Sequence, residues 1–586
     1  MNIILSTLNA KYIHTSLALR SIKAYCNDFK DDIKILEFTI NHQENYILNE
    51  IFKNKPDILA FSCYIWNIEQ TIDLVRELKK VLPSTSIILG GPEVSYDGEE
   101  LLKSYKEIDI IVSGEGEETF YELLRNYKDN NGDLSDIEGI IYRIDGKIIK
   151  TRERKLLDLD DIPFPYEDFD DLSNQILYYE SSRGCPYQCQ YCLSSRDKKV
   201  RFLSLERVFS DLQYFLKENV KQVKSVDRTF NCNKKHSLSI WKYLMENDNG
   251  KTNFHFEISA DILDDETLEL LAKARPSLFQ FEIGIQTTNI DVLSTIERKM
   301  DFDKLSNIVK RIKSNKNIHQ HLDLIAGLPG EDYNSFKRSF NDVYSLYPEK
   351  LQLGFLKVLK GSKMRHNKDE YGLVYKDKAP YEILFTKELS YRELLKLKMI
   401  EEMLEIYYNS GHFYYSIRYI SSYFDSPFDF YEALADYWES RGFHHINHSK
   451  LSLFTNLLNF YQEKINKNEK IFKELLKFDM YLHEKVKKFP DWMFSINEKY
   501  KMEIRDFYNN EENIKNYLPK LIDCSPKVIS RRAHLEIFPI NITDIIKNIE
   551  LEREIGEVKE EAAAVLFDYL SKDEILGHAS FYKVII

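Results

Sequence analysis

Short apolar runs alternate with amphipathic stretches in two separate parts of the chain, and this alternation restricts the fold more than any other feature. In the first part the helical pattern is clearest at Ile68–Val81, and the predicted strands are residues 2–6, 33–38, 58–62, 86–89 and 108–113. Strands that alternate with helices form parallel sheets. The sequence therefore predicts an N-terminal doubly wound, Rossmann-like α/β domain over residues 1–135. A linker over residues 136–177 should follow, with a hairpin at 139–143 and 147–152.

The second alternation predicts a central partial (β/α)6 barrel over residues 178–375. Its predicted strands are residues 178–181, 222–226, 253–258, 278–283, 320–324 and 350–355. In both kinds of parallel sheet, ligands bind at the carboxyl ends of the strands. Residues 376–586 are rich in Leu, Tyr, Phe, Lys and Glu at helical spacing, which predicts a mostly helical C-terminal domain with a short strand at 580–585.

The composition indicates which class of substrate and which cellular location to expect. Lys and Arg number 81 against 94 Asp and Glu, a net charge of −13 without long runs of one sign. Enzymes that act on nucleic acids usually carry a basic stripe, so we expect a small-molecule substrate and no direct nucleic-acid binding. No apolar run approaches the roughly 20 residues of a membrane span, and no signal peptide is recognisable. The sequence predicts a cytoplasmic protein without a membrane partner.

Three of the seven cysteines lie within eight residues, at Cys185, Cys189 and Cys192. The C-x3-C-x2-C spacing places three thiolates on one tight loop, and iron–sulfur clusters prefer such soft ligands. A fourth local ligand is missing, so one iron of a 4Fe–4S cluster keeps a position for an external chelating ligand. A zinc site would need another Cys or His nearby, and none occurs in the sequence there.

This segment and the strands after it resemble the radical S-adenosylmethionine (SAM) superfamily over roughly residues 178–360. The resemblance implies a 4Fe–4S cluster on Cys185, Cys189 and Cys192, SAM as the external ligand, and an electron donor such as flavodoxin or ferredoxin. It also implies cofactor contacts, with Tyr191 near the adenine, Asp227 at the methionine amino group, and Glu257, Ser259 and Gln286 as further polar contacts. Ser225-Val226-Asp227-Arg228 departs from the family's Gly-Gly-Glu, which puts the role of Asp227 in doubt.

The N-terminal domain resembles the cobalamin-binding-type domains that precede many radical SAM barrels. The resemblance rests on residues 8–14, on Gly90-Gly91-Pro92 and on residues 114–117. The Asp-x-His-x-x-Gly sequence that supplies a cobalt ligand elsewhere is missing, which leaves cobalamin binding open. Residues expected to meet a ligand or substrate are Tyr12, His14, Tyr64, Trp66 and Lys357. A histidine that caps the first helix, and an aromatic cluster that fills an empty pocket, are the structural alternatives.

These features predict a radical SAM enzyme whose 5′-deoxyadenosyl radical abstracts hydrogen from a small molecule. Known enzymes with this three-part layout include some that cut the free base queuine to a deazaguanine precursor, and this lyase reaction is the preferred prediction. The first alternative is cobalamin-dependent methyl transfer, and the second is a non-catalytic cobalamin or SAM sensor. Methylthiolation of tRNA is disfavoured because it would need a second cluster, and the other four cysteines are widely separated.

Overall fold

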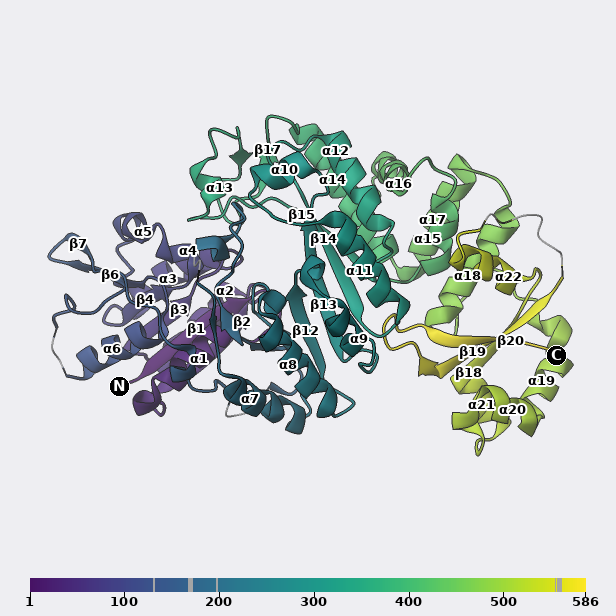
Figure 1. Cartoon of the computed structure of the whole chain (residues 1–586), viewed down its shortest axis with the longest axis horizontal. Helices are drawn as coiled ribbons and strands as arrows, with labels where there is room; N and C mark the ends of the chain where they lie inside the picture. Colours follow the sequence, from purple (N-terminus) through teal and green to yellow (C-terminus); the bar gives the residue numbers. More distant parts are fainter. Residues whose placement is uncertain (130–131, 167–171, 197–198, 554, 556–560) are drawn as a thin grey trace. The chain divides into compact units, whose positions relative to one another are not determined.

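The computed structural model describes residues 1–129, 132–166, 172–196, 199–553, 555 and 561–586, coloured along the sequence in Figure 1. These residues form two compact units. The first consists of Met1–Ser335 and Gly354–Tyr391, and the second of Phe336–Leu353 and Arg392–Ile586. The first unit contains the N-terminal α/β region and most of the predicted barrel, and the second contains most of the C-terminal region.

The N-terminal sheet has the strand order β2-β1-β3-β4-β5-β6-β7, and its first five strands are parallel. Neighbouring residues of β1 belong to different apolar cores, since Ile4 packs in one and Ile3 and Leu5 in the other. Alternate residues of a strand point to opposite faces, so both faces are covered, as in a doubly wound fold. The strands are β1 (Ile3–Asn9), β2 (Ile33–Thr39), β3 (Ile58–Ser62), β4 (Ser86–Gly90), β5 (Ile110–Val112), β6 (Ile140–Ile144) and β7 (Lys147–Lys150). The helices are α1 (Leu17–Tyr25), α2 (Glu44–Asn54), α3 (Ile68–Val81), α4 (Pro92–Ser95), α5 (Gly98–Ser104) and α6 (Glu117–Lys128).

The predicted hairpin forms, but it belongs to this sheet. β6 pairs antiparallel with β5, and β7 pairs antiparallel with β6. The sheet is therefore mixed and not purely parallel. Ile140, Ile141 and Tyr142 are buried, and their apolar side chains extend the two cores by one further strand.

The second sheet confirms the partial barrel, with the strand order β8-β11-β12-β13-β14-β15. In β13 buried apolar residues alternate with half-buried Gln280, Glu282, Gly284 and Gln286. The parallel register pairs Glu257 of β12 with Glu282, so polar side chains of adjacent strands share one face. The strands are β8 (Leu177–Tyr179), β11 (Gln222–Ser225), β12 (Asn253–Ile258), β13 (Phe279–Gln286), β14 (His319–Ala326) and β15 (Lys350–Phe355).

Helices and short two-stranded ladders lie between these strands and after the last of them. The helices are α7 (Leu205–Lys217), α8 (Lys234–Glu246), α9 (Asp265–Leu271), α10 (Ile290–Thr295), α11 (Phe302–Ser314), α12 (Tyr333–Tyr344) and α13 (Lys363–His366). The ladders join β9 (Ser182–Arg183) to β10 (Arg201–Phe202), and β16 (Val374–Tyr375) to β17 (Ile383–Phe385).

The C-terminal region is mainly helical, as expected, but it also contains a small antiparallel sheet. The helices are α14 (Tyr391–Leu404), α15 (Tyr414–Ser421), α16 (Pro427–Arg441), α17 (Lys450–Lys464), α18 (Glu469–His483), α19 (Lys501–Asn509), α20 (Glu511–Tyr517), α21 (Pro526–Arg532) and α22 (Ile542–Glu550). The sheet order is β18 (Ala533–Phe538), β19 (Ala563–Lys572), β20 (Ala579–Val584), and only β20 was predicted. A short apolar run fits a buried helix or a strand equally well, which explains why β18 and β19 were missed. Among the described residues, no helix has the length and apolar character needed to cross a bilayer.

Candidate functional site

The three motif cysteines line one cavity of about 240 Å³ in the barrel part of the first unit. Cys185 and Cys189 are buried and Cys192 is half-buried. The loop begins at Gly184, whose φ of +108° and distance of 2.7 Å from an added Cβ to the Lys199 carbonyl oxygen exclude other residues there. Burial raises the pKa of the Cys185 thiol. The loop brings together three cysteine side chains, and a bound cluster would hold their sulfurs as thiolates.

Polar groups from the carboxyl ends of the barrel strands form the other walls of this cluster cavity. Of the residues predicted to contact SAM, four line it: Tyr191, Glu257, Ser259 and Gln286. Burial and nearby Glu282 raise the pKa of Glu257 to about 6. Asp323 from β14 also lines the cavity, and burial beside Glu282 and Glu257 raises its pKa well above its usual range. The carboxyl end of the barrel is thus a polar pocket next to the thiolates.

The cavity fits a 4Fe–4S cluster with SAM as its external ligand. Three side-chain atoms in its lining are buried without a hydrogen-bond partner: Gln286 Oε1, Asp323 Oδ1 and Arg298 Nε. Buried polar groups are costly unless they are paired, so these atoms await polar partners of the kind that SAM supplies. A Cβ on Gly284 would lie 2.3 Å from Gln286 Nε2, which shows that the glycine leaves space for this amide.

Arg298 is a site residue that sequence reasoning missed. It follows α10, and its Nη1 lies 3.7 Å from Cys189 Sγ and 3.3 Å from the Tyr191 hydroxyl. Its Nη2 donates to the Gly284 carbonyl oxygen. Burial opposes its charge, but Tyr191 and Cys189 raise the pKa of Arg298 above the ordinary value. No local motif marks this arginine, because the chain fold alone brings residues 189 and 298 together.

Asp227 lies outside the lining of the cluster cavity. Its fully buried carboxylate accepts from Ser181 N at 3.1 Å and Ser181 Oγ at 2.9 Å. The hydroxyls of Ser182 and Ser225 donate to the same carboxylate. These donors already satisfy Asp227, which therefore anchors the end of β11. The predicted contact with the methionine amino group finds no support in this geometry.

A second cavity of about 550 Å³ lies at the carboxyl edge of the N-terminal sheet, against the start of the barrel. His14, Tyr64 and Trp66, three of the predicted ligand contacts, line it. The rings of Tyr64 and Trp66 stack at 4.5 Å between centroids. His14 Nδ1 lies 2.8 Å from the Tyr178 hydroxyl, and burial lowers the pKa of His14. Tyr12, which is 70% exposed, and Lys357 do not belong to the lining of either cavity.

The second cavity suits a large flat ligand with a tail such as cobalamin. A smaller cavity of about 120 Å³ adjoins it and runs along the ends of β3, β4 and β5. Both are lined by Tyr64 and by Gly114 and Gly116. Gly114 has a φ of +86° with open space where a Cβ would stand. Stacked aromatic rings and bare backbone at a strand edge are the surfaces that a macrocycle can approach closely.

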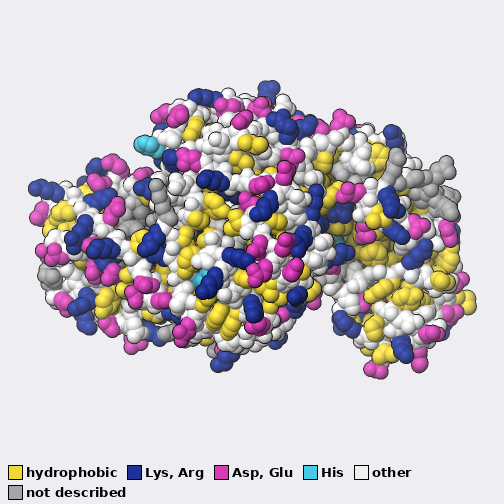
Figure 2. Space-filling model, in the orientation of Figure 1, with side chains coloured by type: hydrophobic (Ala, Val, Ile, Leu, Met, Phe, Trp, Pro, Cys, Tyr) yellow, Lys and Arg dark blue, Asp and Glu magenta, His cyan; other side chains and the backbone are white. Residues whose placement is uncertain are grey.

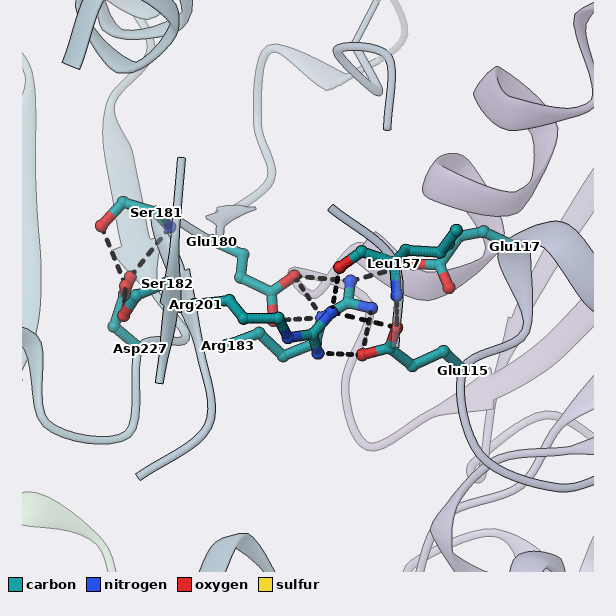
Figure 3. Close-up of polar contacts among 9 residues, drawn as sticks. All are labelled: Glu115, Glu117, Leu157, Glu180, Ser181, Ser182, Arg183, Arg201 and Asp227. Carbon is teal, nitrogen blue, oxygen red and sulfur yellow. Dashed lines mark hydrogen bonds and ion pairs between the residues drawn. The ribbon is translucent and has the colours of Figure 1, made fainter. Parts of the chain in front are cut away.

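Charged residues connect the loops of the two cavities, as Figure 3 shows. Arg183, two residues before Cys185, binds Glu117 at 2.9 Å and Glu180 at 2.7 Å. Glu115 pairs with Arg183 and with Arg201. Burial opposes ionisation of Glu115, but the hydrogen bond from Arg201 and the charge of Arg183 lower its pKa. The loop after β5 and the loop before the cluster cysteines are therefore held together.

Three family models match the chain. The B12 binding domain matches residues 4–124, and the Radical SAM superfamily matches residues 179–343. A family described as a protein of unknown function (DUF4080) matches residues 369–567.

Curated relatives include the cobalamin-dependent radical SAM methyltransferase TokK of Streptomyces tokunonensis, with 26% identity over 48% of this chain and 44% of that protein. The 2-(S-pantetheinyl)-carbapenam-3-carboxylate methyltransferase of Streptantibioticus cattleyicolor is 28% identical over 48% of this chain and 44% of that protein. The chain thus matches less than half of the length of these relatives.

Two solved enzymes share the fold. The match with the cobalamin-dependent SAM radical enzyme OxsB covers 94% of this chain and 84% of the OxsB chain, with a TM-score of 0.55 and 14% sequence identity. The match with the radical SAM methyltransferase TsrM from Kitasatospora setae covers 65% of this chain and 80% of the TsrM chain, with a TM-score of 0.54 and 15% sequence identity.

The chain therefore contains a B12-binding domain followed by a radical SAM domain. The radical SAM domain implies a 4Fe–4S cluster and SAM, and the B12 binding domain supports cobalamin as a further cofactor although the Asp-x-His-x-x-Gly sequence is missing. The preferred prediction of queuine fragmentation is not supported, because the relatives named above are methyltransferases and not lyases.

Proposed function

We propose that this protein is a cobalamin-dependent radical SAM methyltransferase that acts on a small molecule. The observation that carries the proposal is the position of the two cavities on either side of one loop, residues 226–229. Val226 and Arg228 line the B12-side cavity, and Arg228 and Thr229 line the cluster cavity. A substrate at this loop has access to both cofactors.

The side chains divide the work between the two cavities. When bound, the cluster and SAM supply a 5′-deoxyadenosyl radical, and cobalamin supplies a carrier for the methyl group. Cys185, Cys189 and Cys192 hold the cluster and leave one iron position for SAM. The amide of Gln286 and the carboxyl groups of Glu257 and Asp323 orient SAM through hydrogen bonds. An external one-electron donor such as flavodoxin or ferredoxin is part of the proposal.

The charge distribution favours a small-molecule substrate. On the face shown in Figure 2, Lys and Arg side chains are interspersed with Asp and Glu, without a broad basic area. A nucleic-acid substrate would favour a continuous basic surface. This pattern and the net charge of −13 support the proposal of a small substrate.

The test is anaerobic expression with cobalamin supply, cluster reconstitution, and a single-turnover reaction with SAM and a strong reductant. We expect bound cobalamin and one equivalent of S-adenosylhomocysteine per cobalamin, because SAM that has given up its methyl group remains as S-adenosylhomocysteine. The Cys185→Ala variant serves as the cluster control. It should lose the cluster absorbance and all 5′-deoxyadenosine while it keeps cobalamin.

Protein that binds no cobalamin and forms no S-adenosylhomocysteine would contradict methyl transfer. A parallel reaction with queuine checks the earlier prediction, since a shortened deazaguanine product would restore the lyase. Failure to consume SAM under either condition would favour a sensor.

A further inference from the structure

The loop of residues 226–229 forms the wall between the two cavities. Thr229 Oγ1 lies 3.6 Å from Cys185 Sγ on the cluster side, and Val226 lines the B12 side. Among the described residues that line these cavities, Arg228 is the one common to both. Arg228 is therefore accessible from both cavities.

The backbone of this loop is fixed. The buried Asp227 carboxylate accepts hydrogen bonds from Ser181, Ser182 and Ser225, and Figure 3 shows the first two of these contacts. Val226 N also donates to the Tyr179 carbonyl oxygen at 2.8 Å. The side chain of the next residue, Arg228, thus starts from a rigid position, which reduces the entropic cost of holding a ligand.

Arg228 differs from Arg183 and Arg201 in whether a carboxylate pairs with its guanidinium. Arg183 and Arg201 are each paired with carboxylates. Arg228 is exposed to the cavities and makes no side-chain hydrogen bond or ion pair among the residues that the structure describes. Its positive charge acts on residues of both cavities. Burial raises the pKa of Tyr64 in the B12-side cavity and of Glu257 in the cluster cavity, and the charge of Arg228 lowers both pKa values. An unpaired guanidinium fork is suited to bind a carboxylate or phosphate through two parallel hydrogen bonds.

We propose that Arg228 binds an anionic group of the substrate, a carboxylate or a phosphate, and so places the substrate between SAM and cobalamin. The inference rests on the proposed methyl transfer, because it assigns the class of substrate for that reaction. The substrate is then a small organic acid or phosphate ester.

The test uses the reconstituted full-length protein with its reduced, paramagnetic cluster and an aza analogue of SAM that cannot be cleaved. ¹³C-acetate and inorganic phosphate are the probes, and their ¹³C and ³¹P relaxation is measured. We expect saturable relaxation enhancement for at least one probe. It should fall about tenfold in Arg228→Gln, since a neutral amide lacks the charge and the two-pronged hydrogen bonding of the guanidinium. The probe with the larger effect distinguishes a carboxylate substrate from a phosphate substrate.

Two further variants complete the design. Arg228→Lys keeps the charge without the fork and should retain part of the enhancement. Lys235→Gln makes the same change of charge at an exposed position on α8 and should leave the enhancement unchanged. Enhancement in the wild type that is equal in Arg228→Gln would overturn the inference. Anion binding that disappears when the SAM analogue is present would also overturn it, since Arg228 would then serve the methionine carboxylate. Methyl transfer itself fails separately, through the absence of S-adenosylhomocysteine in the single-turnover reaction.

Discussion

At the scale of single residues, Arg298 is the side chain that most directly affects the cluster. Its guanidinium contacts Cys189 Sγ and the Gly284 carbonyl oxygen. Positive charge and hydrogen bonds at the sulfur ligands raise the reduction potential of an iron–sulfur cluster. We expect Arg298→Leu to lower the potential of the 4Fe–4S cluster, measured by an EPR-monitored redox titration. An unchanged potential in a variant with full cluster content would contradict this role.

Gly284 and Gln286 allow a separate test of the SAM pocket. A Cβ at position 284 meets the far end of the Gln286 side chain at 2.3 Å, and this amide can move at little cost to stability. We therefore expect Gly284→Ala to weaken SAM binding about tenfold, measured by equilibrium dialysis, with a nearly unchanged melting temperature.

The matched control is Gly354→Ala on β15. There the nearest atom to an added Cβ is the Leu324 carbonyl oxygen at 3.5 Å, an ordinary contact. SAM affinity should be unaffected in this variant. Equal SAM affinity in Gly284→Ala and the wild type would show that Gln286 does not contact SAM.

At the scale of elements, the segment between β8 and the cluster loop is held from two sides. Arg183, which also pairs with Glu180, binds Glu117 after β5, while Ser181 and Ser182 bind Asp227 beyond β11 (Figure 3). Local sequence gives no indication of this arrangement, because its partners lie 45 residues or more away along the chain.

We expect Asp227→Asn to destabilise the first unit by about 2 kcal/mol, since an amide cannot accept from all of these donors and hydrogen bonds to a charged group are worth about 1.5–3 kcal/mol. Thermal unfolding followed by circular dichroism measures the change. Asp265→Asn, at an exposed position in the first turn of α9, is the control. Similar melting temperatures for both variants would argue against Asp227 as an anchor.

The sequence predicted those strands and helices whose own hydrophobic spacing identifies them without knowledge of their neighbours. The barrel strands were placed within a few residues, and helix Ile68–Val81 was confirmed with the predicted bounds. The cysteine spacing was sufficient to locate the cluster cavity. The positions of Arg298 and Arg228 were not predictable, because each depends on how distant strands align. The buried position of Asp227 was not predictable for a similar reason, since its partners Ser181 and Ser182 lie 46 and 45 residues earlier in the chain.

At the scale of the whole molecule, the second unit contains a cluster of three histidines. His412, His483 and His578 are clustered, with ring centroids 4.3 Å apart for the first pair and 4.9 Å for the second. His483 Nε2 and His578 Nε2 donate to the Gly411 carbonyl oxygen at 3.1 and 3.2 Å. Burial and nearby Lys450 lower the pKa of His412 to about 4. Burial and the other two histidines lower the pKa of His483 to about 3.

We expect this histidine cluster to make the second unit less stable in acid. The unfolded chain binds protons at these histidines as pH falls through about 6.5, while in the folded unit His412 stays neutral until about pH 4 and His483 until about pH 3. Because the unfolded state then binds more protons, stability is fully present above pH 6.5 and is lost progressively as pH falls toward 3. We expect calorimetry of the full-length protein to show that the unfolding temperature of the second unit, assigned by limited proteolysis, falls by several degrees between pH 7 and 5.

His483→Gln should reduce this pH dependence of the unfolding temperature, whereas His445→Gln, at an exposed position, should leave it intact. A transition of the second unit that does not move between pH 7 and 5 would mean that the cluster is protonated in the folded state.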